Sequence, residues 1–129
     1  MSTIWKQKKF MLDLVDSIDE IVGGKVFCRK AYYLMDYESA DVYSFDLDGT
    51  NKKTFLENVF TYFSYNNKIY WCEEKYMEDE ERYGYIWRSC DFNGENKTDV
   101  TDWLYTGDFE DPENMYSKEY VIENYIENN

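Results

Sequence analysis

Carboxylates are the residues of this sequence whose number and type most readily suggest acid–base or metal chemistry. The chain contains 27 aspartates and glutamates and no histidine, which excludes Ser-His and Cys-His catalysis. One protonated and one ionised carboxyl group can hydrolyse a glycosidic bond. However, so many acids provide some pair at any separation, and no nucleophile-elbow or phosphate-loop motif accompanies them. We therefore expect a protein that is not an enzyme and uses no cofactor.

Two short motifs place oxygen-bearing side chains at alternate positions, as calcium-binding loops do. They are Asp46-x-Asp48-Gly49 and Asp91-x-Asn93-Gly94. The rest of a calcium loop is missing from both, so we interpret them as tight turns, in which such side chains bond to nearby backbone groups. The three cysteines have no histidine and no C-x-x-C spacing, which favours buried thiols over a metal site; they are Cys28, Cys72 and Cys90.

The most specific feature is a dense acidic insertion, "CEEKYMEDEERYGY" at residues 72–85, followed by a second acidic cluster beyond residue 98. Aromatic side chains interleave with the acids, and such residues are enriched at protein interfaces. A charged, solvated loop explains either cluster alone, whereas the two together favour a binding role. The candidate partner-binding residues are Glu73, Glu74, Tyr76, Glu78, Asp79, Glu80, Glu81, Tyr83, Asp102, Trp103, Asp108, Glu110, Asp111 and Glu113.

Charge is distributed unevenly along the chain. Of the net −13, residues 1–30 contribute +2 and residues 31–129 contribute −15. Such a field repels nucleic acid and anionic membranes and favours basic protein surfaces. No apolar run is long enough to span a membrane, and acidic residues interrupt the apolar start of the chain. We therefore expect a cytoplasmic protein that binds neither nucleic acid nor membrane directly.

These residues are expected to lie on a mainly antiparallel β fold of the α+β class, with a helix at each end. Apolar residues at spacings of three and four before Gly23 and Gly24 predict an amphipathic helix over residues 1–24. A similar stripe and the Ser117 cap predict a short C-terminal helix near residues 118–127. We expect one domain, with β units at 25–57 and 58–103 and an acidic, partly helical segment at 104–129.

The β region contains an internal repeat. "SFDLDGTNKKT" at residues 44–54 resembles "SCDFNGENKT" at 89–98, and "KVFC" at 25–28 resembles "KIYWC" at 68–72. Alternating β-branched and aromatic runs between polar turn residues predict four antiparallel strands in each unit. Asparagine and glycine at the turns, including Asn66-Asn67, suit hairpins that need positive φ.

Over residues 25–103 this pattern resembles the blade repeats of YWTD-type or TolB-like β-propellers. The resemblance implies four-stranded blades, and a blade has about the length of this repeat. A propeller closes with about four to eight blades, whereas this chain has material for two. We therefore expect the two sheets to pack on each other rather than to assemble with those of other copies.

Together these features predict a small acidic protein that binds and blocks a basic, nucleic-acid-handling protein such as a nuclease. Phage inhibitors of host defence nucleases and immunity proteins against toxin nucleases are also small acidic proteins that bind a basic partner. Such a protein can act as a nucleic-acid mimic. One alternative is a carbohydrate- or peptide-binding module with a platform of Tyr43, Tyr70, Trp71, Tyr85 and Trp87. A second alternative is a propeller-like structural protein that forms homo-oligomers through its open sheet edges.

Overall fold

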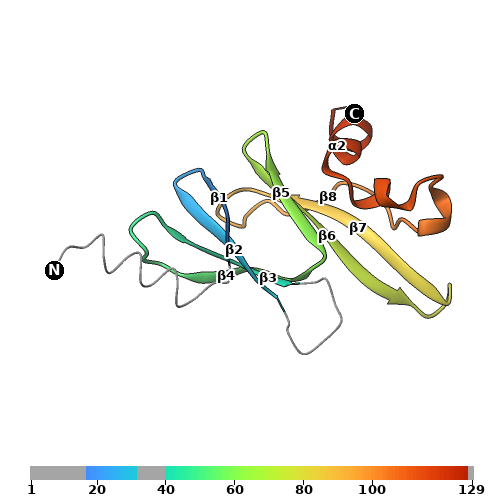
Figure 1. Cartoon of the computed structure of the whole chain (residues 1–129), viewed down its shortest axis with the longest axis horizontal. Coiled ribbons are helices and arrows are strands. Elements are labelled where there is room, and N and C mark those ends of the chain that lie inside the picture. The colour runs from blue at the N-terminus through green and yellow to red at the C-terminus, as the bar shows by residue number, and fades with distance from the viewer. Residues whose placement is uncertain (1–16, 32–39, 128–129) are drawn as a thin grey trace. The chain divides into compact units, whose positions relative to one another are not determined.

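The computed structural model describes residues 17–31 and 40–127 and divides the chain into two compact units, residues 1–59 and 60–129 (Figure 1). Within the described residues, each unit contains a four-stranded antiparallel sheet whose strands are adjacent in chain order. The first sheet consists of β1 (Ser17–Val22), β2 (Lys25–Ala31), β3 (Ala40–Asp46) and β4 (Lys53–Val59). The second consists of β5 (Thr61–Tyr65), β6 (Lys68–Met77), β7 (Arg82–Cys90) and β8 (Thr98–Asp99).

The mainly antiparallel β fold expected from the sequence is confirmed. The four strands expected in the second unit are also confirmed, whereas only three strands, β2 to β4, begin within the range expected for the first unit, and the fourth strand of that sheet, β1, precedes it. The resemblance to propeller blades and the single-domain organisation stay predictions.

The predicted N-terminal helix is wrong at its C-terminal end. Residues 17–22 form strand β1 instead, and residues 1–16 lie outside the described part of the chain. Ile18 and Ile21 were expected on the buried stripe of a helix, but 45% and 63% of their surface is exposed. Val22 pairs with Lys25 across a two-residue turn, so the glycines that we expected to end a helix instead close a β-hairpin.

The first hairpins of the two sheets have the same kind of turn. Gly23 and Gly24 have φ of 62° and 76°, and Asn66 and Asn67 have φ of 54° and 67°. Two consecutive residues with positive φ define the type I′ turn, whose twist matches that of the flanking strands. Glycine and asparagine are the residues that adopt this conformation most easily.

The repeated motif forms the same loop in both sheets. The backbone N–H groups of Asp46 and Asp91 each donate to the carbonyl four residues later, at 2.8 Å. Their carboxylates each accept a hydrogen bond from an asparagine amide, Asn51 or Asn96, at 2.6 Å. Both asparagines have φ of 58°. The sequence repeat is therefore a repeat of structure, and the interpretation of these motifs as turns is confirmed.

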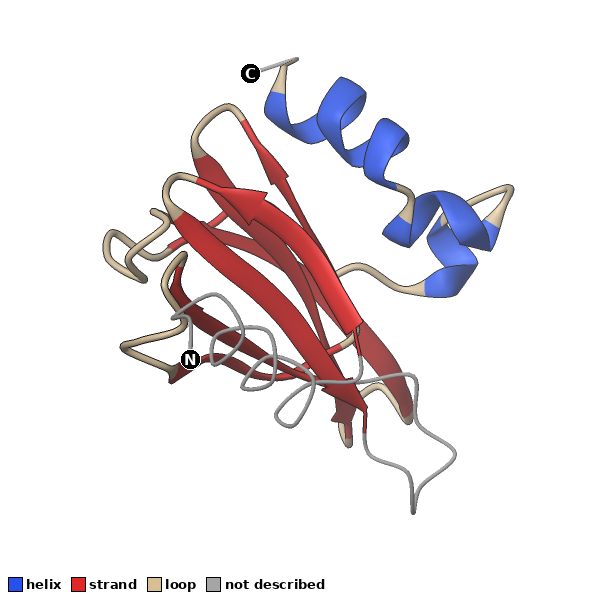
Figure 2. Cartoon of the chain, turned by 60° about the vertical axis from the view of Figure 1, so that its left-hand side comes forward, coloured by secondary structure: helices blue, strands red, loops and turns tan. Residues whose placement is uncertain are grey.

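The second unit buries its core between one face of its sheet and the C-terminal segment (Figure 2). That segment contains the 3₁₀ helices η1 (Thr106–Asp108) and η2 (Pro112–Tyr116), the α-helix α2 (Lys118–Val121) and the π-helical turn η3 (Ile122–Ile126). The short C-terminal helix is thus confirmed, and Ser117 caps it by accepting from the N–H of Tyr120. Fully buried Val121 and Trp87 lie in this core.

The first unit has a smaller apolar cluster on one face of its sheet. Val26, Cys28 and Phe45 are buried there, with Tyr43 packed against them. None of the helices in the described residues is long and apolar enough to cross a membrane.

Candidate acidic interaction surface

The hairpin of β6 and β7 extends beyond its neighbouring strands. β5 pairs with β6 only as far as Cys72, whereas β6 and β7 stay paired up to Met77 and Arg82. A tight turn over residues 78–81 closes the hairpin, with the N–H of Glu80 donating to the carbonyl of Met77 at 3.1 Å. The acidic insertion therefore forms a projecting end, which we call the hairpin tip (residues 75–83).

One face of the hairpin tip presents two exposed aromatic rings. Tyr76 and Tyr83 are directly opposite each other in the strand register, and 48% of the surface of each residue is exposed. Their ring centroids are 5.2 Å apart and nearly perpendicular, which is a favourable edge-to-face contact. Exposed rings that are already packed together can contact a partner with little loss of side-chain freedom.

On the other face, Gly84 lets three side chains pack closely over the strand. A Cβ atom at this position would lie 3.1 to 3.3 Å from atoms of Trp103, Met77 and Tyr105. The segment that supplies Trp103 and Tyr105 is fixed beside β7 by paired backbone hydrogen bonds between Leu104 and Tyr85, at 2.7 and 2.9 Å. Tyr105 is thus held against the hairpin although it is 20 positions or more away in the sequence.

Arg82 connects Tyr105 to the turn. Its guanidinium carbon lies 3.7 Å from the centroid of the Tyr105 ring, and its Nη2 is 3.0 Å from Oε2 of Glu80. The side chains of Arg82 and Glu80 are 44% and 49% exposed. The contact is therefore a surface contact, of the kind that adds little to stability.

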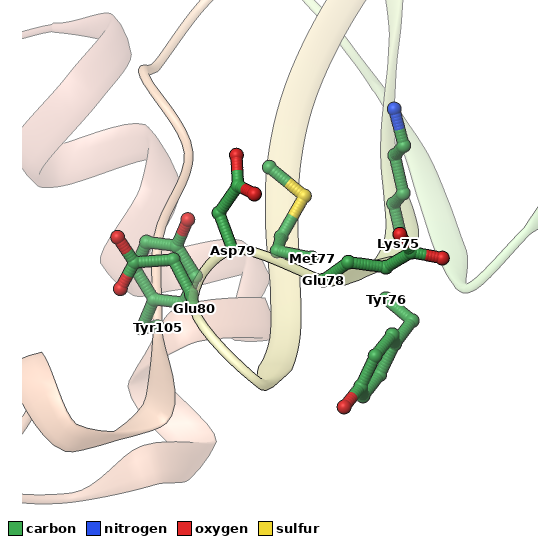
Figure 3. Close-up of a pocket in the computed structure, with 7 residues that line it drawn as sticks. All are labelled: Lys75, Tyr76, Met77, Glu78, Asp79, Glu80 and Tyr105. Atoms are coloured by element: carbon green, nitrogen blue, oxygen red, sulfur yellow. The ribbon is translucent and has the colours of Figure 1, made fainter.

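A pocket of about 540 Å³ lies at the hairpin tip (Figure 3). Figure 3 shows the ring of Tyr76 directed away from Asp79 and from Met77, and Met77 is its neighbour on the opposite face of β6. Acidic, aromatic and thioether side chains surround the pocket together with one lysine. Its lining residues are Lys75, Tyr76, Met77, Glu78, Asp79, Glu80 and Tyr105.

Three of the predicted acids, Glu78, Asp79 and Glu81, are exposed at the turn. Within residues 17–31 and 40–127, none of the three forms an ion pair. Their charge therefore faces solvent and is available to a partner.

Two other predicted site residues have internal roles instead. Glu73 is 3.0 Å from Arg88, which is also 3.0 Å from Asp99, and Glu73 accepts a hydrogen bond from the indole of Trp71 at 2.7 Å. Glu74 accepts from the hydroxyl of Tyr85 at 2.6 Å. These half-exposed carboxylates satisfy donors of the sheet, so their charge is less available to a partner than that of the acids at the turn.

The Glu74 contact also shapes the ionisation of its partner. Burial raises the pKa of Tyr85 well above its ordinary value, and the hydrogen bond to Glu74 raises it further. Tyr85 therefore stays a hydrogen-bond donor at any physiological pH.

The second acidic cluster is exposed along the C-terminal segment. Tyr105, which contacts Arg82 of the hairpin tip, lies within this cluster, between Asp102 and η1. Asp111 also has a structural role, since its side chain accepts from the N–H of Glu113 at the start of η2. Trp103 is half-buried. The exposed acids of the cluster are Asp102, Asp108, Glu110, Asp111 and Glu113.

The turn aspartates of the repeated loops are engaged by donors. Asp46 is 2.7 Å from Nζ of Lys25, and this hydrogen bond, together with that from Asn51, holds the pKa of Asp46 below its ordinary value. In the part of the chain that the structure describes, no group of three or more acidic or thiol side chains is arranged to hold a metal ion.

The aromatic platform considered as an alternative is largely internal. Tyr70, Trp71 and Trp87 are 7%, 3% and 0% exposed, and Tyr85 is bonded to Glu74. Tyr76 and Tyr83 at the hairpin tip, by contrast, are exposed.

Comparison with protein-family models, with curated proteins and with solved structures found no match to this chain.

Proposed function

We propose that this protein binds a basic protein surface through the hairpin tip and the adjoining acidic segment, and that its partner handles nucleic acid. The observation that supports this most strongly is that the hairpin tip combines the exposed Tyr76–Tyr83 pair with three exposed carboxylates that form no ion pair with any residue the structure describes. Charge steers a basic partner toward the surface, and packed aromatic rings supply the contact energy after encounter.

The charge of the second unit adds to this proposal. Residues 60–129 contain 17 acidic and six basic residues, a net −11, whereas residues 1–59 have a net −2. Two of the six basic residues, Arg82 and Arg88, are already paired with carboxylates. A protein surface that normally binds the phosphate backbone would be attracted to this unit for the same electrostatic reason.

The test uses a tip variant, Glu78→Gln/Asp79→Asn/Glu81→Gln, and a matched control, Glu57→Gln/Glu95→Gln/Glu123→Gln, which removes the same charge from exposed positions elsewhere. Proteins captured by the tagged chain are identified, and the Kd of each is measured from about 50 to about 500 mM NaCl. We expect the tip variant to weaken binding roughly tenfold or more and the control to change it much less.

Two results would contradict the proposal. One is an affinity that does not respond to salt, because exposed charges are screened at high ionic strength. The other is an equal loss in both variants, which would mean that net charge acts without a defined site. The nucleic-acid part is tested separately: the captured protein should bind nucleic acid, and this chain should compete with that binding.

A further inference from the structure

We propose, on the basis of the function proposed above, that the pocket at the hairpin tip receives an arginine side chain of the basic partner, and that Arg82 competes for the same groups in the free protein. The pocket is lined by three carboxylates and one lysine, together with two tyrosines and a methionine: Glu78, Asp79, Glu80, Lys75, Tyr76, Tyr105 and Met77. It therefore offers an aromatic ring and carboxylates within one concave surface, which suits a cation with a flat, apolar face.

Arg82 makes an intramolecular contact of the kind that the proposal requires. Its guanidinium stacks 3.7 Å from the centre of the Tyr105 ring while it bonds to Glu80 at 3.0 Å. Arg82 is not itself a lining residue of the pocket, although it contacts two residues that are. A guanidinium from a partner that enters the pocket would meet the same ring and the same carboxylate, with Glu78 and Asp79 in addition.

The Arg82 contact can be exchanged readily. The side chains of Arg82 and Glu80 are both nearly half exposed, so water can replace the ion pair between them at little cost. The Tyr105 ring does not depend on Arg82 for its position, because it packs over Gly84 beside Trp103 and Met77. The ring is therefore in place before a partner binds, which reduces the ordering that binding requires.

The chemistry favours arginine over lysine. A guanidinium is planar, stacks on aromatic rings and bonds to carboxylates through several N–H groups in a fixed geometry. An ammonium group has the same charge but is compact and more strongly hydrated. An acidic surface without the Tyr105 ring would lack the stacking contribution to this preference.

The test compares labelled oligo-arginine and oligo-lysine peptides of equal length by fluorescence anisotropy. We expect the wild-type protein to bind the arginine peptide about two- to fivefold more tightly. Tyr105→Leu should abolish this preference, whereas Tyr105→Phe should keep it. Arg82→Lys leaves the net charge unchanged but weakens the internal competitor, so it should increase affinity for the arginine peptide, while the matched change Lys97→Arg in the loop at residues 91–97 should not.

The outcomes separate the two proposals. Equal binding of both peptides by the wild-type protein, or an arginine preference that survives Tyr105→Leu, would overturn the arginine pocket and leave the electrostatic function intact. Failure of both peptides to bind at low ionic strength would instead count against the acidic surface itself. Arg82→Lys binding the arginine peptide no better than wild type would show that Arg82 does not compete.

Discussion

Trp87 connects the second sheet to the C-terminal segment through one side chain. The residue is completely buried, its ring packs 5.3 Å from that of Phe63, and its indole Nε1–H donates to the carbonyl of Met115 at 2.8 Å. Met115 lies in η2 and is also completely buried. The indole thus provides both core volume and the hydrogen-bond partner of a buried carbonyl.

Replacing Trp87 with phenylalanine should lower the free energy of unfolding by about 1–3 kcal/mol, because the carbonyl of Met115 would lose its donor and part of the indole volume would be left empty. Urea unfolding followed by circular dichroism measures this change. The exposed substitution Tyr83→Phe is the control and should stay within about 0.5 kcal/mol of the wild type. Equal stability of Trp87→Phe and wild type would contradict this role of the indole.

At the same scale, the candidate site was only partly predictable from the sequence. Glu73 and Glu78 look alike in the acidic insertion, but one is bonded to Arg88 and Trp71 whereas the other faces solvent. Whether a glutamate is paired or exposed depends on which residues lie beside it across the strands. A count of charges along the sequence does not show this. Tyr105 was missed for a related reason: its contact with Arg82 depends on how the chain after β8 returns along β7.

Among the elements, the repeated loop allows the contributions of conformation and hydrogen bonding to be separated. Asn96 adopts a φ of 58° and donates to Asp91 at 2.6 Å. Asparagine tolerates this left-handed conformation better than most residues with a side chain, and glycine adopts it without steric cost.

We expect Asn96→Ala to destabilise the protein by about 1–2 kcal/mol or more, since alanine is strained at this φ and cannot donate. Asn96→Gly should cost less, because it loses only the hydrogen bond and some chain entropy. Thermal or urea unfolding of the two variants gives the comparison. The same order is expected at Asn51 in the first sheet, and the reverse order at either position would show that backbone strain is not the dominant cost.

The β1 strand shows why one element was assigned wrongly. Residues 17–22 continue a run of apolar residues at helical spacing, but six residues are too few for that period to be decisive. The repeat itself held the missing signal: Gly23-Gly24 precedes Lys25 as Asn66-Asn67 precedes Lys68. Extending the alignment of the two copies by two residues would have indicated a hairpin turn. The strands of the second sheet were predictable because polar turns separate them: Asn66-Asn67, the acidic residues 78–81 and the loop at residues 91–97.

For the molecule as a whole, burial of ionisable groups should make the free energy of unfolding fall as the pH becomes alkaline. Cys28 is completely buried, and burial, assisted by the negative charge of Asp19, raises its pKa from 9.0 to about 11. Burial likewise raises the pKa of Cys72 and of Tyr85. In each case the folded state favours the neutral, protonated form.

The sign of the pH effect follows from these directions. Well below pH 9 both the folded and the unfolded chain keep the Cys28 thiol protonated, so the full stability is present. Between pH 9 and about 11 the unfolded chain releases this proton and the folded chain retains it, so the free energy of unfolding falls as the pH rises. Urea unfolding at a series of pH values measures the slope, which should be shallower in Cys28→Ala. An unchanged slope in that variant would contradict the assignment to Cys28.

Because the loop at Asp46 and the loop at Asp91 share a backbone geometry within one polypeptide, each can serve as an internal standard for the other. The backbone N–H groups of Asp46 and Asp91 each donate to a carbonyl with a nitrogen–oxygen distance of 2.8 Å. The Asp46 side chain, however, also forms an ion pair with Lys25. No ion pair forms at Asp91 within the described residues. Temperature, buffer and denaturant act on both protons alike. A difference in their hydrogen–deuterium exchange would therefore report local surroundings, free of the uncertainty that comparing separate samples introduces.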